Sequence, residues 1–518
     1  MVEKPWSLSD DQRSETVARV AQNIESLAFS RGVDITDAEA RTIAADVEKK
    51  AYTVATVEAT TTTGFRPHDE VLKSYARKLA ALVLDKVKAS NGKDQEADAR
   101  ADSTELDLAG DREFLTAESA SEALAPLLAQ GSAITKVKFS TKSFGRDAAE
   151  VAANAVANVA ASLEHADLSD IIAGRPEAEA LEAMRIISGA LAQVQLRSLN
   201  LSDNALGEKG VRACAAAISG QVGLQRLAFQ NVGCSIRACQ AVAELVQNSG
   251  ELRALHLYNN MSDNEGAIAI AQILSRAPLM EDFRMASSRV GSEGGIALAQ
   301  GLSAGSSLVK LDLSDNPMTA EVAPALAETL RGHDELQVLN LNDVALGDEG
   351  IESIAEVLPA NLVELHLALN EVTAEGAANL AVALARLNRL QVLSLRENEL
   401  ENDGAIAIAQ ALTHLPQLRT LDLAQNQIGR LGAVALAKAV AGAANLERFD
   451  LDENQISEGG VDQVKDILEK AGLSKTLSLE DNDADADEEG NEGEEEGEEN
   501  GDADVDDLAD ALAHKATI

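Results

Sequence analysis

The sequence predicts an α/β solenoid in which short parallel strands line one face and helices line the other. Three observations support this prediction: an apolar motif recurs at constant spacing, a helical pattern follows each copy, and aromatic residues make up only 2% of the chain. The motif reads L-x-x-L-x-L-x-x-N, and its steps are 28 residues except for one step of 26. This spacing is typical of long leucine-rich repeats. The first apolar position of each copy falls at Leu196, Leu224, Leu252, Met280, Leu308, Leu336, Leu362, Leu390, Leu418 and Leu446.

A single repeat shows why the motif encodes a strand, a turn and a helix. In the copy that begins at Leu196, Leu199 and Leu201 alternate with polar residues, as a strand with one buried face requires. Asn204 then turns the chain, and its amide can bond the backbone of neighbouring coils. Residues 210–219 follow with a helical apolar pattern. Because one repeat cannot bury these faces alone, we expect about a dozen coils to stack into a ribonuclease-inhibitor-like horseshoe.

Composition and charge limit the possible functions. The 518 residues carry a formal net charge of −42, which argues against binding to nucleic acid or anionic membranes and favours a basic partner. The three cysteines, Cys214, Cys234 and Cys239, show no repeated ligand spacing, so neither a disulfide framework nor a zinc module is expected. No apolar run approaches the length of a membrane span, and the N-terminus lacks a signal-peptide pattern. We therefore expect a cytoplasmic protein without direct membrane insertion.

The chain is predicted to contain four segments. Residues 1–90 form a small all-α domain, because capping boxes at Ser9-x-x-Gln12 and Thr36-x-x-Glu39 open helical patterns and a third helix follows residues 66–70. Residues 91–105 are polar without periodicity and form a flexible linker, residues 106–482 form the solenoid, and the acidic residues 483–518 are mostly disordered. The three helical patterns carry apolar residues at Val17, Val20, Ile24 and Leu27; at Ile43, Val47, Ala51 and Val54; and at Val71, Tyr75, Leu79, Leu82 and Val83.

One coil of the solenoid is longer than its neighbours. The step from Leu163 to Leu196 is 33 residues, so about five extra residues lie around positions 169–177. Loops on rigid scaffolds often carry function, and Gly174 and Pro176 would stiffen a loop that presents Arg175. The alternative is that Arg175 pairs with a nearby carboxylate such as Asp170, and the residues alone favour this alternative.

The asparagine that ends each copy of the motif occupies what we call the ladder position. The residues just before the ladder positions form a row of their own along the solenoid. In the repeat that begins at Leu224, Val232 occupies the ladder position, so Asn231 points toward the rim of the solenoid. This row is mostly acidic or amide, which fits either an ordinary solvated face or a docking surface for a basic protein. Its members are Asp203, Asn231, Asn259, Ser287, Asp315, Asp343, Leu369, Glu397, Gln425, Glu453 and Asp481.

Two segments of the N-terminal domain resemble a known family. Residues 51–57 (AYTVATV) and 63–70 (TGFRPHDE), with Trp6 near the start, are similar to the WPP domain of plants. The resemblance implies anchoring at the nuclear envelope through coiled-coil membrane partners. The Trp-Pro-Pro tripeptide of that family is replaced by Trp6-Ser7-Leu8 in this chain.

The solenoid carries a second resemblance. The string S-D-I-x-x-G-R at residues 169–175 and the repeat at residues 199–207, combined with the WPP-like domain and the acidic tail, resemble the plant Ran GTPase-activating proteins. The resemblance implies that the chain stimulates GTP hydrolysis by Ran and so supports nucleocytoplasmic transport. It also implies that Asn231 matches the family's asparagine, which orients the catalytic glutamine of the GTPase, and that Arg175 matches its required arginine.

Further expectations follow from this resemblance. Ran would bind in its GTP-bound form and would itself carry Mg²⁺ and GTP, so the chain needs no cofactor and no active site of its own. Ran-binding protein and coiled-coil anchors that contact residues 1–90 are further expected partners, with a location in the cytoplasm or at the outer nuclear envelope. The predicted GTPase-binding residues are Asp170, Asp203, Asn259, Asp315, Asp343 and Glu397.

Two other classes of function are compatible with a chain of this size. An enzyme with its own active site is disfavoured because the seven histidines are scattered and the H-E-x-x-H, P-loop and G-x-S-x-G motifs are missing from the sequence. A non-catalytic leucine-rich-repeat scaffold or inhibitor is the alternative that remains. Such a protein would bind its partner stoichiometrically, whereas an activator would act on an excess of GTPase.

Overall fold

The computed structural model describes residues 13, 16–21, 24, 37–61, 71, 75–76, 78–79, 104–205 and 207–482. The chain divides into two compact units, residues 1–103 and 104–518. Most of the predicted linker, the predicted acidic tail and Trp6 lie outside the described residues. Among the residues that are described, no helix has the length and apolar character needed to span a membrane.

The first unit is helical where it is described. Helix α2 spans Asp37–Thr61, and residues 16–21 are also helical. Several of the predicted apolar positions are buried together, which confirms that these patterns form one core: Val20, Ile24, Val47, Ala51, Val71, Tyr75 and Leu79. Leu27, Leu82 and Val83 lie outside the described residues. A buried carboxylate joins the helices, because Glu48 accepts hydrogen bonds from Arg13 (2.8 Å) and from the hydroxyl of Tyr75 (2.9 Å).

The second unit is built on a parallel sheet of fourteen strands, ordered β1-β3-β5 and then β6 to β16 in sequence. Each strand pairs with the strand of the next coil, as in the register Leu199↔Leu227↔Leu255. A second parallel sheet of two strands, β2 (Glu113–Leu115) and β4 (Lys142–Phe144), lies on the first coils. The strands of the long sheet are β1 Glu105–Asp107, β3 Lys136–Lys138, β5 His165–Asp167, β6 Ser198–Asn200, β7 Arg226–Ala228, β8 Ala254–His256, β9 Asp282–Arg284, β10 Lys310–Asp312, β11 Val338–Asn340, β12 Glu364–His366, β13 Val392–Ser394, β14 Thr420–Asp422, β15 Arg448–Asp450 and β16 Leu477–Ser478.

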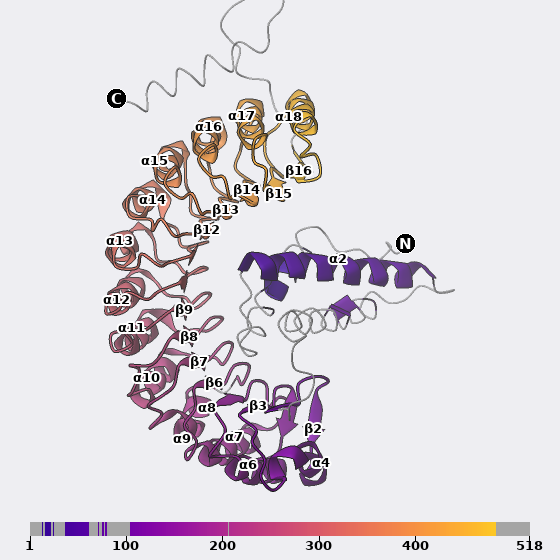
Figure 1. Ribbon diagram of the computed structural model, residues 1–518, viewed down its shortest axis with the longest axis vertical. Helices are drawn as coiled ribbons and strands as arrows, with labels where there is room; N and C mark the ends of the chain where they lie inside the picture. Colours follow the sequence, from indigo (N-terminus) through magenta and orange to yellow (C-terminus); the bar gives the residue numbers. More distant parts are fainter. Residues whose placement is uncertain are drawn as a thin grey trace, which may run out of the picture. The chain divides into compact units, whose positions relative to one another are not determined.

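Helices cover the outer face of this sheet, so that the solenoid unit curves with its strands on the inside (Figure 1). The predicted fold class, a leucine-rich-repeat solenoid with a parallel sheet lined by helices, is confirmed. The core consists of the inward strand residues and of the small apolar residues of the helices. The three cysteines are buried in this unit and are not disulfide-bonded. The helices are α4 Ala117–Ala123, α5 Ala125–Leu128, α6 Arg146–Asn158, α7 Glu177–Leu191, α8 Gly207–Ala213, α9 Ala215–Ile218, α10 Ile236–Leu245, α11 Asp263–Leu274, α12 Ser292–Leu302, the 3₁₀ helix η2 Ala320–Val322, α13 Ala323–Arg331, α14 Gly347–Ala355, α15 Ala374–Leu384, α16 Glu401–Leu412, α17 Arg430–Val440 and α18 Glu458–Lys470.

The ladder asparagines bond successive coils together. The Oδ1 atom of Asn398 accepts hydrogen bonds from the backbone N–H groups of Asn370 (2.9 Å) and Val372 (3.1 Å) in the preceding coil. Its Nδ2 atom donates to the carbonyl oxygens of Leu367 (3.0 Å) and Leu395 (2.9 Å). Because these backbone groups are buried, each amide satisfies donors and acceptors that water cannot reach.

The residue before each ladder position turns the chain where the strand face ends. In every coil from β5 onward this residue has a left-handed backbone, with φ between 48° and 61°. Asp and Asn adopt this conformation at lower cost than most residues, which accounts for part of the acidic and amide composition of the row. We call these positions the rim row: Asp170, Asp203, Asn231, Asn259, Ser287, Asp315, Asp343, Leu369, Glu397, Gln425, Glu453 and Asp481.

The long coil has both a longer loop and a longer helix than a neighbouring coil. Nine residues (168–176) separate the end of β5 at Asp167 from the start of α7 at Glu177, whereas six (201–206) separate β6 from α8. Helix α7 has 15 residues and α10 has 10. The loop expected around residues 169–177 is thus longer than the loop of the next coil, and part of the added length also extends helix α7.

Replacing Asn398 by alanine tests the ladder. The substitution leaves two backbone N–H groups buried without an acceptor, so we expect the free energy of unfolding to fall by about 2–4 kcal/mol. Urea unfolding followed by circular dichroism measures the change. The control is Glu399→Ala at the next, exposed position, which should leave the midpoint nearly unchanged. Equal midpoints for the two variants would contradict the role given to the ladder.

Candidate functional site

Three side chains of the rim row form a hydrogen-bonded line after strands β6, β7 and β8. The Nδ2 atom of Asn231 donates to Oδ1 of Asp203 (3.0 Å), and Nδ2 of Asn259 donates to Oδ1 of Asn231 (3.3 Å). All three residues are exposed. The backbone beneath them is fixed as well, because the N–H groups of Asp203 and Asn231 donate to the carbonyls of Gln230 (2.8 Å) and Tyr258 (3.1 Å).

This line holds the amide of Asn231 in one orientation. A primary amide has two N–H donors and an oxygen with two lone pairs. One N–H is used toward Asp203 and one lone pair toward Asn259. One donor and one acceptor therefore remain on an exposed side chain, a pattern complementary to a second primary amide.

The carboxylate of Asp203 lies in a partly desolvated and negatively charged environment. Desolvation raises the pKa of Asp203, the hydrogen bond from Asn231 opposes this effect, and the negative charge of Asp170 adds to the increase. Ionisation of Asp203 is therefore less favourable than ionisation of an ordinary surface aspartate, although the hydrogen bond from Asn231 favours the charged form.

Arg175 is committed to contacts within the fold. Its Nη2 atom donates to the backbone carbonyls of Ser143 (2.8 Å) and Leu115 (3.3 Å), and its Nε atom donates to Oγ of Ser143 (3.0 Å). Its Nη1 atom lies 3.3 Å from a carboxylate oxygen of Glu179. The guanidinium also lies over the ring of Phe114, 5.0 Å from its centroid, and only 17% of the side chain is exposed. Arg175 thus joins the two-stranded sheet to the start of helix α7.

The guanidinium of Arg175 is not presented to solvent, in contrast to the first expectation. As the alternative expected, it pairs with a nearby carboxylate, but that partner is Glu179 and not Asp170. Asp170 pairs instead with Arg112. The positive φ of Gly174 (74°) belongs to the same close packing, because a Cβ atom there would lie 2.7 Å from Phe114.

Sequence reasoning missed Arg112, Phe114 and Ser143. These residues lie in the first two coils, where the repeat is degenerate and no strand like β2 or β4 is implied by the motif. The one signal available was the short run Glu113-Phe114-Leu115 ahead of a capping threonine at Thr116.

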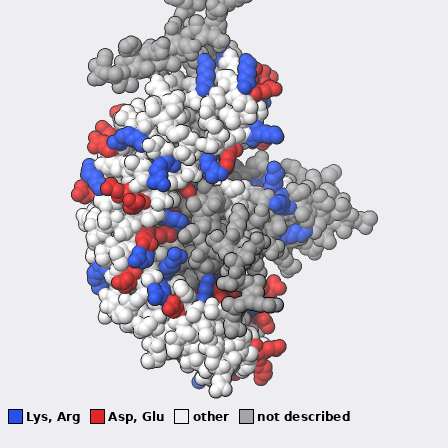
Figure 2. Space-filling model, viewed as in Figure 1, with Lys and Arg blue, Asp and Glu red and all other residues white. Residues whose placement is uncertain are grey.

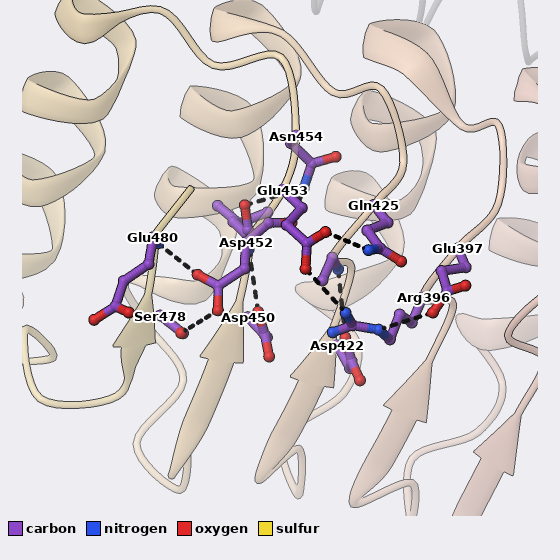
Figure 3. A network of polar contacts seen from close by, with 12 residues as sticks. Arg396, Glu397, Asp422, Gln425, Asp450, Asp452, Glu453, Asn454, Ser478 and Glu480 are labelled. Carbon is purple, nitrogen blue, oxygen red and sulfur yellow. Dashed lines mark hydrogen bonds and ion pairs between the residues drawn. The ribbon is translucent and has the colours of Figure 1, made fainter. Parts of the chain in front are cut away.

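The remaining predicted rim residues lie farther along the same row. Asp315 and Asp343 are exposed, and the pKa of Asp343 is raised by desolvation, with further contributions from Asp315 and Glu397. Glu397 is paired with Arg396 (3.2 Å), which also approaches Glu453 (3.5 Å) at the C-terminal end of the row (Figure 3). The structure therefore groups Asp170, Asp203, Asn231 and Asn259, and places Asp315, Asp343 and Glu397 on later coils.

Acidic and basic side chains are interspersed over the coils on the face of the solenoid seen in Figure 2. Exposed ion pairs occur along the solenoid unit, such as Arg212 with Glu208 and Glu244. Within the described residues, His, Cys, Asp and Glu side chains form no group arranged to hold a metal ion. The rim row offers hydrogen-bonding groups and negative charge to a partner.

Segments in both parts of the chain match known protein families. Residues 4–97 match the WPP domain. Residues 195–213, 336–355, 359–381, 388–409 and 414–437 match the leucine-rich repeat. The chain contains a WPP domain and leucine-rich repeats.

Two proteins of Arabidopsis thaliana are similar to this chain. RAN GTPase-activating protein 1 is 39% identical over 233 residues, which cover 43% of this chain and 42% of that protein. RAN GTPase-activating protein 2 is 53% identical over 118 residues, which cover 23% of this chain and 22% of that protein. The chain thus matches less than half the length of either relative. The predicted resemblance to plant Ran GTPase-activating proteins is confirmed.

Among solved structures, an internalin from Listeria monocytogenes aligns with 70% of this chain and 94% of its own, at 14% identity and a TM-score of 0.44. The assignment of the fold depends on the strand order and the matched repeats of this chain itself.

Arg175→Ala tests the structural role of this arginine. The substitution removes donors to two buried carbonyl groups and to Ser143, so we expect the free energy of unfolding to fall by about 2–3 kcal/mol. The control is Arg185→Ala, because Arg185 is 61% exposed on helix α7 and pairs only with Glu182 in the described structure. Urea midpoints measure both changes. A midpoint for Arg175→Ala that matches the control would show that these contacts contribute little.

Asp203→Asn tests the electrostatic environment of the line. The pKa of Asp203 is higher in the folded protein than in the unfolded chain. The free energy of unfolding therefore falls as the pH rises from the unfolded-state pKa through the folded-state pKa. Asparagine does not ionise, so the variant avoids this loss. We expect the variant to be more stable than the wild type near pH 8 and the difference to shrink as the pH falls through the raised pKa. Urea midpoints across this pH range provide the measurement. A difference that grows on acidification would contradict the shift.

Proposed function

We propose that this chain is a GTPase-activating protein that stimulates GTP hydrolysis by the small GTPase Ran. The single observation that carries the proposal is the fixed amide of Asn231 on the exposed rim row, held between Asp203 and Asn259. The similarity to two proteins named Ran GTPase-activating proteins supports the choice of GTPase.

The chemistry of phosphoryl transfer suits such a site. Hydrolysis of GTP needs an oriented water molecule and stabilisation of charge, with little covalent chemistry from the protein. An activator that accelerates hydrolysis by about 10⁵-fold lowers the barrier by about 7 kcal/mol. The free N–H and free lone pair of Asn231 match the amide of a glutamine side chain. Asn231 therefore orients the water-positioning glutamine of the GTPase, and Ran supplies the nucleotide and its Mg²⁺.

The proposed division of labour follows from the contacts of each residue. Asn231 acts directly on the GTPase. Arg175 acts indirectly, because it fixes the two-stranded sheet and the start of helix α7 beside the rim row. Asp170, Asp203, Asn259, Asp315, Asp343 and Glu397 form the acidic and amide surface on which a basic face of the GTPase docks.

Pre-organisation supports this assignment of Asn231. A side chain that must find its orientation during docking loses conformational freedom at that step, whereas Asn231 is already bonded on both sides. The rigid coil beneath it, fixed by the backbone bond to Tyr258, keeps the amide in place as the GTPase arrives.

The wider cellular role is part of the same proposal. A Ran activator supports nucleocytoplasmic transport from the cytoplasm, and the WPP domain would hold the protein at the outer nuclear envelope through coiled-coil anchors. Ran-binding protein is a further proposed partner. In this chain Trp6-Ser7-Leu8 stands in place of the Trp-Pro-Pro tripeptide of that family.

Multiple-turnover hydrolysis separates this function from a stoichiometric scaffold or inhibitor. The full chain, at about one hundredth the concentration of GTP-loaded Ran, is expected to convert the whole pool to GDP. The same amount should leave Ras, Rho and Rab GTPases unaffected. Binding without turnover would identify a scaffold and would refute the proposed activity.

Asn231→Ala should lower the rate constant for stimulated hydrolysis by about 100- to 1,000-fold, as expected when one orienting group is removed from a phosphoryl-transfer site. The matched control is Asn445→Ala, because Asn445 is an exposed asparagine before strand β15 that bonds the carbonyl of Pro416 (2.9 Å). Single-turnover assays at saturating activator measure both. Wild-type rates for Asn231→Ala would remove this residue from the mechanism.

A further inference from the structure

Arg112 lies beside the N-terminal end of the rim row. It follows strand β1 and forms an ion pair with Asp170, the rim residue of the coil that contains β5. The coil between them, which contains β3, contributes Thr141 with a left-handed backbone (φ 67°). Arg112 therefore extends along the edge of the solenoid across two coils, and 56% of its side chain is exposed.

The backbone that carries Arg112 is fixed on both sides. The N–H of Gly110 donates to Oγ1 of Thr141 (3.1 Å), and the N–H of Glu113 donates to the carbonyl of Thr141 (3.3 Å). The Nζ atom of Lys142 donates to the carbonyl of Asp111 (2.8 Å). The guanidinium is thus mounted on a rigid part of the solenoid, as a binding residue requires.

Arg112 and Arg175 differ in what they can offer a partner. Arg175 uses all three of its nitrogen atoms within the fold and is 17% exposed. In the described structure Asp170 is the one group to which Arg112 hydrogen-bonds, and an arginine has five N–H donors. The charge of Arg112 also opposes the rise in the pKa of Asp203, the acceptor for Asn231.

On the basis of the activity proposed above, we propose that Arg112 is a positioning residue that binds a carboxylate of the docked GTPase beside its nucleotide pocket. The rim row repeats acidic and amide groups from coil to coil, with strands about 4.8 Å apart. A basic surface attracted by this row alone could dock at several successive coils. An exposed guanidinium at one end of the row makes these docking positions unequal, because it binds a negative charge on the partner and repels a positive one. Arg112 thereby sets the register in which Asn231 meets the nucleotide pocket.

The test is steady-state kinetics of the full chain with GTP-loaded Ran as the substrate. Arg112→Ala is expected to raise KM roughly three- to tenfold while kcat stays within about twofold of the wild type. Arg112→Lys keeps the positive charge but loses the planar guanidinium, so its KM should lie between the KM of the wild type and that of Arg112→Ala. The matched control is Arg185→Ala, which removes an arginine of similar exposure and pairing from helix α7 and should leave KM unchanged.

Salt and stability distinguish a contact with the GTPase from a structural effect. The ratio of KM values between Arg112→Ala and wild type should shrink as KCl is raised from about 50 to about 300 mM, because exposed charges are screened. The urea midpoint of Arg112→Ala should match that of Arg185→Ala.

A KM equal to the control, or a loss that appears in kcat instead, would overturn the assignment of Arg112. A wild-type chain that fails to stimulate Ran would instead refute the proposed function, and this result would be visible before any variant is compared.

Discussion

The structure depends on the bonding of each coil to the next by a buried side-chain amide. In the motif L-x-x-L-x-L-x-x-N the leucines supply the core, and the asparagine ties the turn to backbone groups of its own and the neighbouring coil, as Asn398 does. The turn that brings the asparagine inward requires a left-handed residue just before it. That residue necessarily projects from the edge, so the same constraint that closes the core creates the rim row.

This origin changes how the acidic character of the rim should be interpreted. Asp and Asn are favoured at these positions because they tolerate a positive φ, whatever the partner. Glu397, Gln425 and Glu453 have no such backbone advantage, and they take part in local contacts with Arg396 or with one another. The part of the row near Asn231 is distinguished by something other than charge, namely a continuous line of side-chain hydrogen bonds from Asp203 to Asn259.

Much of this could be predicted from the sequence, because periodicity reports local packing. The motif predicted the strands, the ladder and the outward position of Asn231, since Val232 occupies the buried ladder site. The contacts of Arg175 could not be predicted in the same way. They depend on β2 and β4, which belong to degenerate coils and pair residues far apart in the sequence, as Leu115 and Arg175 are. The partner of Asp170 was missed for the same reason, because Arg112 lies 58 residues away.

The proposed mechanism depends on the position of one amide, that of Asn231, relative to the nucleotide pocket of the GTPase. The most direct measurement is a structure of the full chain bound to Ran that carries a non-hydrolysable GTP analogue. We expect the amide of Asn231 to lie within about 3.5 Å of the catalytic glutamine side chain of Ran, with the GTPase bound to the rim row after strands β5 to β8. A complex in which Ran contacts the outer helices, or in which Asn231 remains exposed to solvent, would contradict it.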